Sequence, residues 1–229
     1  MLQPRYLLHT GEGDRFGEAV HHIDVYAFDS LGIYRKMFRD KGAHLKNGYR
    51  MPIDLPEGKW TFLCLGGKVG DYEIGIFKTG IPQQFSPAVS PGITTLSDFR
   101  VKAYFEQKEN LEYSFGELFF GRLDSVEITA DNGGTGVVDL MKNTNKIEVR
   151  VKGIADGSSA RITSDNGRFN SENVTPADAG TIIYVPYYSA SQADDTRVFQ
   201  FDVLRLYTDG HLFLKLLNPC LLYTSDAAD

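Results

Sequence analysis

Residues 117–153 read ELFFGRLDSVEITADNGGTGVVDLMKNTNKIEVRVKG and hold two strand patterns separated by a glycine-rich break. In the second pattern, Ile147, Val149 and Val151 alternate with charged residues. This period of two predicts a half-buried β-strand. Residues 131–136, between the patterns, tolerate positive φ and carry little apolar surface. We interpret this break as the junction of two domains, and the alternative is an ordinary hairpin within one sheet.

The chain of 229 residues has room for one large all-β domain or for two domains of about 100 to 130 residues each. We expect two: an N-terminal β-sandwich domain over residues 1–131 and an incomplete C-terminal β-sandwich domain over residues 132–220. Lys142, Asn143 and Asn145 are interpreted as a turn or bulge early in the second domain, rather than as a polar site.

Short strand patterns continue through the rest of the chain. Trp60, Phe62 and Cys64 share one face by their period of two, and we interpret that face as core; the alternative is that Trp60 is an exposed ligand platform. No 3.6-residue stripe is sustained, so an all-β sandwich architecture is indicated. Further strands are predicted at residues 23–28, 33–38, 49–55, 60–65, 181–188, 198–206 and 211–217.

Between residues 69 and 109, glycine and proline interrupt every apolar run. We expect mostly long loop here, with a short strand at residues 72–77 and a helical piece near residues 98–104. Loops of this length are uncommon unless they serve contacts. The segment is therefore a candidate binding surface, with a plain insertion as the alternative.

Composition and charge exclude several classes of protein. The net charge is −6, from 30 acidic and 24 basic residues, and nucleic-acid binding needs a basic footprint that this chain lacks. Cys64 and Cys220 are too few for a disulfide framework and lack metal-ligand spacing; Cys64 is interpreted as a buried small hydrophobe. No apolar run approaches the roughly 20 residues of a membrane span, and no signal-peptide core follows Met1. Read literally, these features describe a soluble cytosolic protein.

Motifs of catalysis are also missing: the sequence has no HExxH, GxSxG, P-loop, or GxGxxG after a strand. His21 and His22 neighbour Asp24, but consecutive strand residues point to opposite faces, so we do not expect them to share a metal. The carboxylates at residues 194–195 lie in a polar loop without the apolar surroundings of an acid catalyst. The tripeptide at 173–175 fits a glycosylation sequon that also recurs by chance. The sequence assigns no catalytic, cofactor-binding or metal-binding residue.

Five segments, taken in order, carry a family likeness. They resemble the fimbrillin-A-associated anchor proteins, which are minor fimbrial subunits and lipoproteins of Bacteroidales-type bacteria. Each segment alone is weak, but the ordered set is fairly specific and extends over about residues 3–218. The segments are IDVYAFDSLG at 23–32, DLPEGKWT at 54–61, ELFFG at 117–121, VDLMKNTNKI at 138–147 and DVLRL at 202–206.

The resemblance implies two tandem transthyretin-like β-sandwich domains and a non-enzymatic subunit that tethers a polymeric fimbria to the outer membrane. It also implies export as a lipoprotein with a lipidated cysteine upstream, a place at the cell surface, and fimbrial (pilin) subunits as partners. No catalytic residue or cofactor comes with it. The alternative function is a cell-surface glycan-binding adhesin module that uses exposed aromatic residues of the loops between residues 70 and 104.

The chain departs from the family pattern at both ends. Met1 stands almost where the mature fold should begin, and residues 221–229 resemble translated sequencing-adaptor sequence, so we expect a fragment with a non-native tail. A second sandwich that stops after the strand at residues 211–217 would lack its closing strand. Its open apolar edge would be of the kind that pairs with another chain.

Overall fold

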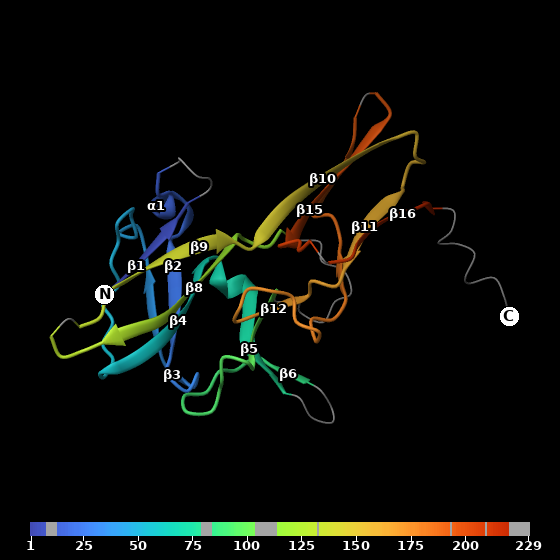
Figure 1. Cartoon of the computed structure of the whole chain (residues 1–229). Coiled ribbons are helices and arrows are strands. Elements are labelled where there is room, and N and C mark those ends of the chain that lie inside the picture. The colour runs from blue at the N-terminus through green and yellow to red at the C-terminus, as the bar shows by residue number, and fades with distance from the viewer. Residues whose placement is uncertain are drawn as a thin grey trace. The chain divides into compact units, whose positions relative to one another are not determined.

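The computed structural model describes residues 1–7, 13–78, 84–103, 114–131, 133–192, 194–208 and 210–219. They form an all-β protein, as the sequence predicts, with one helical turn and one 3₁₀ turn (Figure 1). The expected tail at residues 221–229 lies outside the described residues. The elements are β1 (Leu2–Tyr6), α1 (Phe16–Ala19), β2 (His22–Phe28), β3 (Tyr34–Lys41), β4 (Gly58–Gly67), η1 (Val69–Asp71), β5 (Tyr72–Lys78), β6 (Gln84–Ser86), β7 (Phe99–Ala103), β8 (Leu118–Ile128), β9 (Gly136–Lys142), β10 (Thr144–Lys152), β11 (Ser159–Ser164), β12 (Arg168–Asn170), β13 (Ile182–Tyr184), β14 (Tyr188–Ser191), β15 (Thr196–Leu204) and β16 (Leu212–Leu217).

The chain divides into two compact units. Unit 1 comprises the described residues of Met1–Tyr104, Gly116–Asn143 and Arg168–Asp178. Unit 2 comprises those of Phe105–Phe115, Thr144–Gly167 and Ala179–Asp229. The division near the middle of the chain thus falls between Asn143 and Thr144, and β9 belongs to unit 1 rather than to the C-terminal part that we placed at residues 132–220.

Unit 1 contains a six-stranded sheet in the order β1-β9-β8-β4-β2-β3. β1 runs parallel to β9, and the other neighbours are antiparallel. Trp60, Phe62 and Cys64 of β4 belong to one hydrophobic core cluster, which confirms the sequence-based core face. Trp60 is 6% exposed, so it is no ligand platform. Because the opposite face of β2 is also buried, this sheet is covered on both sides.

The second sheet of unit 1 has the order β12-β7-β5-β6. Phe99 of β7 makes edge-to-face contacts with Tyr26 and Phe28 of β2, and Phe169 of β12 makes another with Phe120 of β8. These rings fill the space between the two sheets, which makes unit 1 a β-sandwich.

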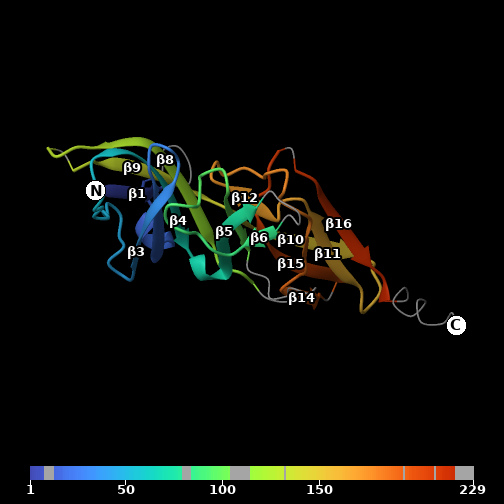
Figure 2. The ribbon, with the colours of Figure 1, turned by 90° about the horizontal axis from the view of Figure 1, so that it is seen from below.

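Unit 2 contains two three-stranded sheets, β10-β15-β14 and β13-β11-β16. β10 pairs antiparallel with β15 along its whole length, from Thr144 opposite Leu204 to Lys152 opposite Thr196. β11 and β16 run side by side in Figures 1 and 2. A buried polar contact joins the layers, because the hydroxyl of Tyr184 on β13 donates to Asn166 Oδ1 at 2.9 Å and accepts from the Leu204 N–H of β15 at 3.2 Å.

The segment at residues 117–153 is the main difference from the sequence-based interpretation. β8 and β9 pair antiparallel, with Phe119 opposite Lys142 and Phe120 opposite Met141. The glycine-rich break is therefore the end of a hairpin in one sheet, which was the alternative interpretation. The chain changes units at Asn143, whose buried amide pairs with that of Asn173.

Two local predictions were wrong. Residues 49–55 form no strand beyond a single bridge between Met51 and Leu2; Pro52 and Pro56 in and beside this run lack the N–H that a ladder requires. Residues 99–103, expected as part of a helical piece, form β7. There Phe99, Val101 and Ala103 are buried alternately, and this period of two outweighs weak helix propensity.

Candidate binding pocket

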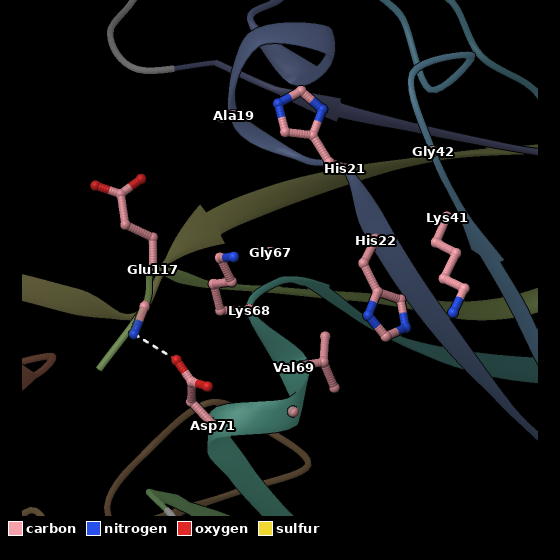
Figure 3. A pocket seen from close by; sticks show the side chains of 12 residues that line it. Ala19, His21, His22, Lys41, Gly42, Gly67, Lys68, Val69, Asp71 and Glu117 are labelled. Atoms are coloured by element: carbon pink, nitrogen blue, oxygen red, sulfur yellow. Dashed lines mark hydrogen bonds between the residues drawn. The ribbon is translucent and has the colours of Figure 1, made fainter. Parts of the chain in front are cut away.

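A pocket of 760 Å³ lies at one end of the six-stranded sheet of unit 1. It is formed where β2 begins, where β3 and β4 end, and just before β8 begins (Figure 3). Its volume is in the range of small-molecule sites, about 300 to 1,000 Å³. The charged and histidine side chains that line it are His21, His22, Lys41, Lys68, Asp71 and Glu117.

Backbone hydrogen bonds hold the rim of this pocket. The Gly42 N–H donates to the His21 carbonyl at 2.9 Å, and the Lys68 N–H donates to the Glu117 carbonyl at 2.9 Å. The Gly116 N–H donates to Asp71 Oδ2 at 2.7 Å, which is the dashed line in Figure 3. The rim is therefore fixed by the ends of the strands.

Glycine is required at two points of the floor. Gly67 has φ +94°, and a Cβ there would lie 2.3 Å from the Glu117 carbonyl oxygen. A Cβ on Gly116 would lie 2.1 Å from Lys68 Cγ. A larger residue at Gly67 would displace the Glu117 backbone, and one at Gly116 would displace the Lys68 side chain.

The acidic side chains around the pocket have hydrogen-bond or ion-pair partners, whereas its two lysine side chains do not have such partners among the described residues. Glu117 forms an ion pair with Lys142, which does not line the pocket, and Asp71 accepts the Gly116 N–H. By contrast, Lys41 and Lys68 are exposed, and neither makes an ion pair with a described carboxylate. The pocket thus presents two ammonium groups without a carboxylate partner in the described part of the chain, and two carboxylates that already have donors.

The two adjacent histidines both border the pocket, and Figure 3 shows their side chains pointing in opposite directions, as the sequence predicts. β2 begins at His22, so His21 precedes the strand. His22 Nε2 lies 2.9 Å from Asp24 Oδ1, and the buried Asp24 carboxylate also accepts two hydrogen bonds from Arg39 at 2.7 Å. Among the residues that the structure describes, no three His, Cys, Asp or Glu side chains gather as a metal site.

The other sequence candidates lie apart from this pocket. Asp194 pairs with Lys152 at 3.0 Å on an exposed hairpin. Asn173 of the sequon has φ +59° and its amide is bonded to Asn143. Cys64 is buried in the core, and burial raises the pKa of its thiol to about 12. It is inert, as the sequence suggested.

Within residues 70–78 and 84–103, which the structure describes, the loops do not show the exposed aromatic surface that the adhesin alternative requires. Tyr72, Phe77 and Phe99 are buried and Phe85 is half-buried in the parts of this segment that the structure covers. Much of it forms β5, β6 and β7. The pocket residues Lys41 and Lys68 were missed from the sequence because only the strand topology brings them together; the glycines at 66, 67 and 70 were the one local sign.

By its fold the chain is a β-sandwich protein, the architecture of many cell-surface domains. The model of the family described as fimbrillin-A associated anchor proteins Mfa1 and Mfa2 matches residues 1–222, and the chain belongs to this family. The resemblance seen in the sequence is thereby confirmed. Curated proteins give no match. None of the helices in the described ranges is long and apolar enough to cross a membrane.

Solved structures share this fold at low sequence identity. A proposed polysaccharide-binding protein of Bacteroides thetaiotaomicron matches with a TM-score of 0.77 and 20% identity, over 96% of this chain and 75% of that one. A proposed adhesin of Bacteroides ovatus gives a TM-score of 0.76 and 22% identity, over 96% and 73%. The fimbrial anchor protein Mfa2 of Porphyromonas gingivalis gives 0.74 and 19%, over 94% and 76%.

Proposed function

We propose that the chain is a non-enzymatic anchor or assembly subunit that tethers a polymeric fimbria to the outer membrane at the cell surface. Membership of the fimbrial anchor family over residues 1–222 supports this proposal. The finer features come from the family resemblance: fimbrial subunits as partners, a lipidated cysteine upstream and two tandem transthyretin-like domains. The last is supported by the two compact units.

Family membership carries this proposal, and the apolar surface of β16 is the place where we propose that a partner segment binds. Leu214 lies opposite Ile162 and Leu216 opposite Ala160 across the β11–β16 pair. Directly opposed residues share a face of the sheet, and Ile162 and Ala160 are 1% exposed. Leu214 and Leu216, on the same face, are nevertheless both 44% exposed.

β16 is also an edge strand. It pairs with β11 on one side, and no strand within the described residues pairs with its other side. An extended segment added there would satisfy the free backbone groups and cover the leucines, as in recognition by strand addition. Burying each leucine would contribute on the order of 1 kcal/mol. We propose that an extended segment of a fimbrial subunit binds at β16, and the competing occupant is the closing strand that, from the sequence, we expect the second sandwich to lack.

Binding to purified fimbrial subunits tests this function. The immobilised chain should bind a subunit encoded beside it, and Leu214→Lys should weaken binding at least about tenfold, because the charge would enter the new apolar contact. Val137→Lys is the matched control, since Val137 is also 44% exposed but lies on β9 of unit 1. Equal losses in the two variants would remove β16 from the proposal, and no binding to any subunit would remove the anchor function.

The non-enzymatic assignment has its own measurement. The chain should not turn over generic esters, peptides or glycosides above the rate of a heat-denatured sample. Turnover that a single substitution abolishes would contradict it.

A second candidate function is glycan binding at the cell surface. The pocket of unit 1 favours it, because it has the size of a small-ligand site with exposed polar groups. Two of the similar structures are a proposed polysaccharide-binding protein and a proposed adhesin. A glycan array tests this function, with Gly70→Phe as the blocking variant. A Cβ at Gly70 meets no atom within 4 Å, so the fold tolerates a large side chain there, and because Gly70 lines the pocket we expect the ring to reduce the space for a ligand.

A further inference from the structure

We propose that the pocket of unit 1 binds a sugar that carries a carboxylate, such as a uronic acid residue. This inference rests on the second candidate function, glycan binding, and adds the chemical class of the ligand. It is independent of the β16 edge, which lies in unit 2.

The free charges favour an anion. Lys41 and Lys68 both line the pocket, and their ammonium groups have no carboxylate partner among the residues described. Glu117 is neutralised by Lys142, which stands outside the lining. A ligand carboxylate would supply the missing partner, and charge-assisted hydrogen bonds are roughly twice as strong as neutral ones.

The arrangement of donors favours a carboxylate over a phosphate. Proteins commonly hold phosphate with free backbone N–H groups at a helix N-terminus or in a nest. Here the N–H groups of Gly42, Lys68, Asp71 and Gly116 are already bonded to protein oxygens. Two separate lysine side chains remain, and they suit a compact anion at the edge of a larger ligand.

The remainder of the pocket suits a sugar ring. Its volume of 760 Å³ leaves room beyond a single anionic group. Ala19 and the glycines offer apolar surface for ring C–H groups. Figure 3 shows Lys41 beside His22 at one side of the view, and Lys68, Glu117 and Asp71 together at the other side. The carboxylate would face Lys41, on the side away from Glu117 and Asp71, while ring hydroxyls donate to these two carboxylates and Lys68 donates to the sugar from their side.

Titration with three matched ligands, followed by ligand NMR, tests the proposal. Methyl glucuronide and methyl glucoside differ by one carboxylate, and glucose 6-phosphate carries a phosphate instead. We expect methyl glucuronide to bind about tenfold more tightly than methyl glucoside, and this preference should shrink as salt is added. A glucuronide-terminated oligosaccharide distinguishes the end of a polysaccharide from a free sugar.

Variants locate the effect. Lys41→Gln with Lys68→Gln should reduce the affinity for methyl glucuronide to that for methyl glucoside. Lys59→Gln is the matched control, because Lys59 is exposed at the opposite end of β4, and it should change nothing. Gly70→Phe should abolish binding of both sugars.

The outcomes distinguish the preference for a carboxylate from the glycan-binding function on which it rests. Equal binding of both methyl glycosides, abolished by Gly70→Phe, would overturn the carboxylate preference and keep glycan binding. Tighter binding of glucose 6-phosphate would overturn it in favour of a phosphate. Absence of binding to any sugar would overturn the inference and the glycan function together, and the fimbrial-subunit assay would be unaffected.

Discussion

The carboxylate of Asp24 on β2 is fully buried. Arg39, opposite it on β3, donates two hydrogen bonds at 2.7 Å, and His22 contacts the same carboxylate. Removing one partner of such a pair leaves a buried charge without its counter-ion. Arg39→Ala should therefore lower the free energy of unfolding by about 3 kcal/mol, measured by urea denaturation with Trp60 fluorescence.

Arg35→Ala is the control for that substitution. Arg35 also lies on β3 and pairs at 2.6 Å with Asp29, whose side chain keeps contact with water. Ion pairs of this kind contribute about 0 to 1 kcal/mol. If the two variants lost equal stability, burial of Asp24 would not be the source of the effect.

At the scale of elements, the short strand β12 depends on a cluster of charges. Asp178 accepts hydrogen bonds from Arg100 of β7 at 2.9 Å and from Arg168 of β12 at 3.4 Å, and the Arg168 guanidinium lies 4.9 Å from the centre of the Phe77 ring. All three charged groups are largely buried. This cluster holds Arg168–Asp178 against the sheet of unit 1.

Asp178→Ala should loosen β12 without unfolding unit 1. Hydrogen exchange of the β12 amides should become about tenfold faster or more. The reason is that the variant loses a charge-assisted hydrogen bond, which lowers the free energy of local opening. Asp156→Ala serves as the control, since Asp156 is fully exposed and lies 3.8 Å from its partner Arg197. Unchanged exchange in Asp178→Ala would show that the ladder to β7 suffices.

The same elements show what the sequence can and cannot predict. Alternation predicted the core face of Trp60 and Phe62, because a period of two depends only on local geometry. The alternation could not show that β9 pairs with β8 in the sheet of unit 1. The sheet that a strand joins depends on contacts with residues far away in the sequence. Asn143, where the chain changes units, pairs with Asn173 thirty positions later. Lys41 and Lys68 of the pocket are likewise unrelated in sequence.

At the scale of the whole molecule, the two units differ in how well their cores are covered. Unit 1 has a six-stranded and a four-stranded sheet with aromatic rings between them. Unit 2 has two three-stranded sheets and leaves leucines of β16 exposed. Small sheets with partly covered faces bury less apolar surface per residue and are less stable. We expect unit 2 to unfold first.

The single tryptophan makes this order measurable. Trp60 lies in the core of unit 1, so its fluorescence follows unit 1 alone, whereas circular dichroism follows strands of both units. In urea the dichroism signal should begin to fall before the fluorescence changes, and non-coincident probes exclude a two-state transition.

Two variants assign the phases to the units. Phe201→Leu in unit 2 should lower the free energy of unfolding of the early phase alone, by about 1 kcal/mol. Phe28→Leu, equally buried in unit 1, should lower that of the late phase. Coincident transitions in all three proteins would contradict this order and would mean that the two units unfold together. The reason would be that the chain passes between the units several times, so that neither unit is formed by one continuous segment.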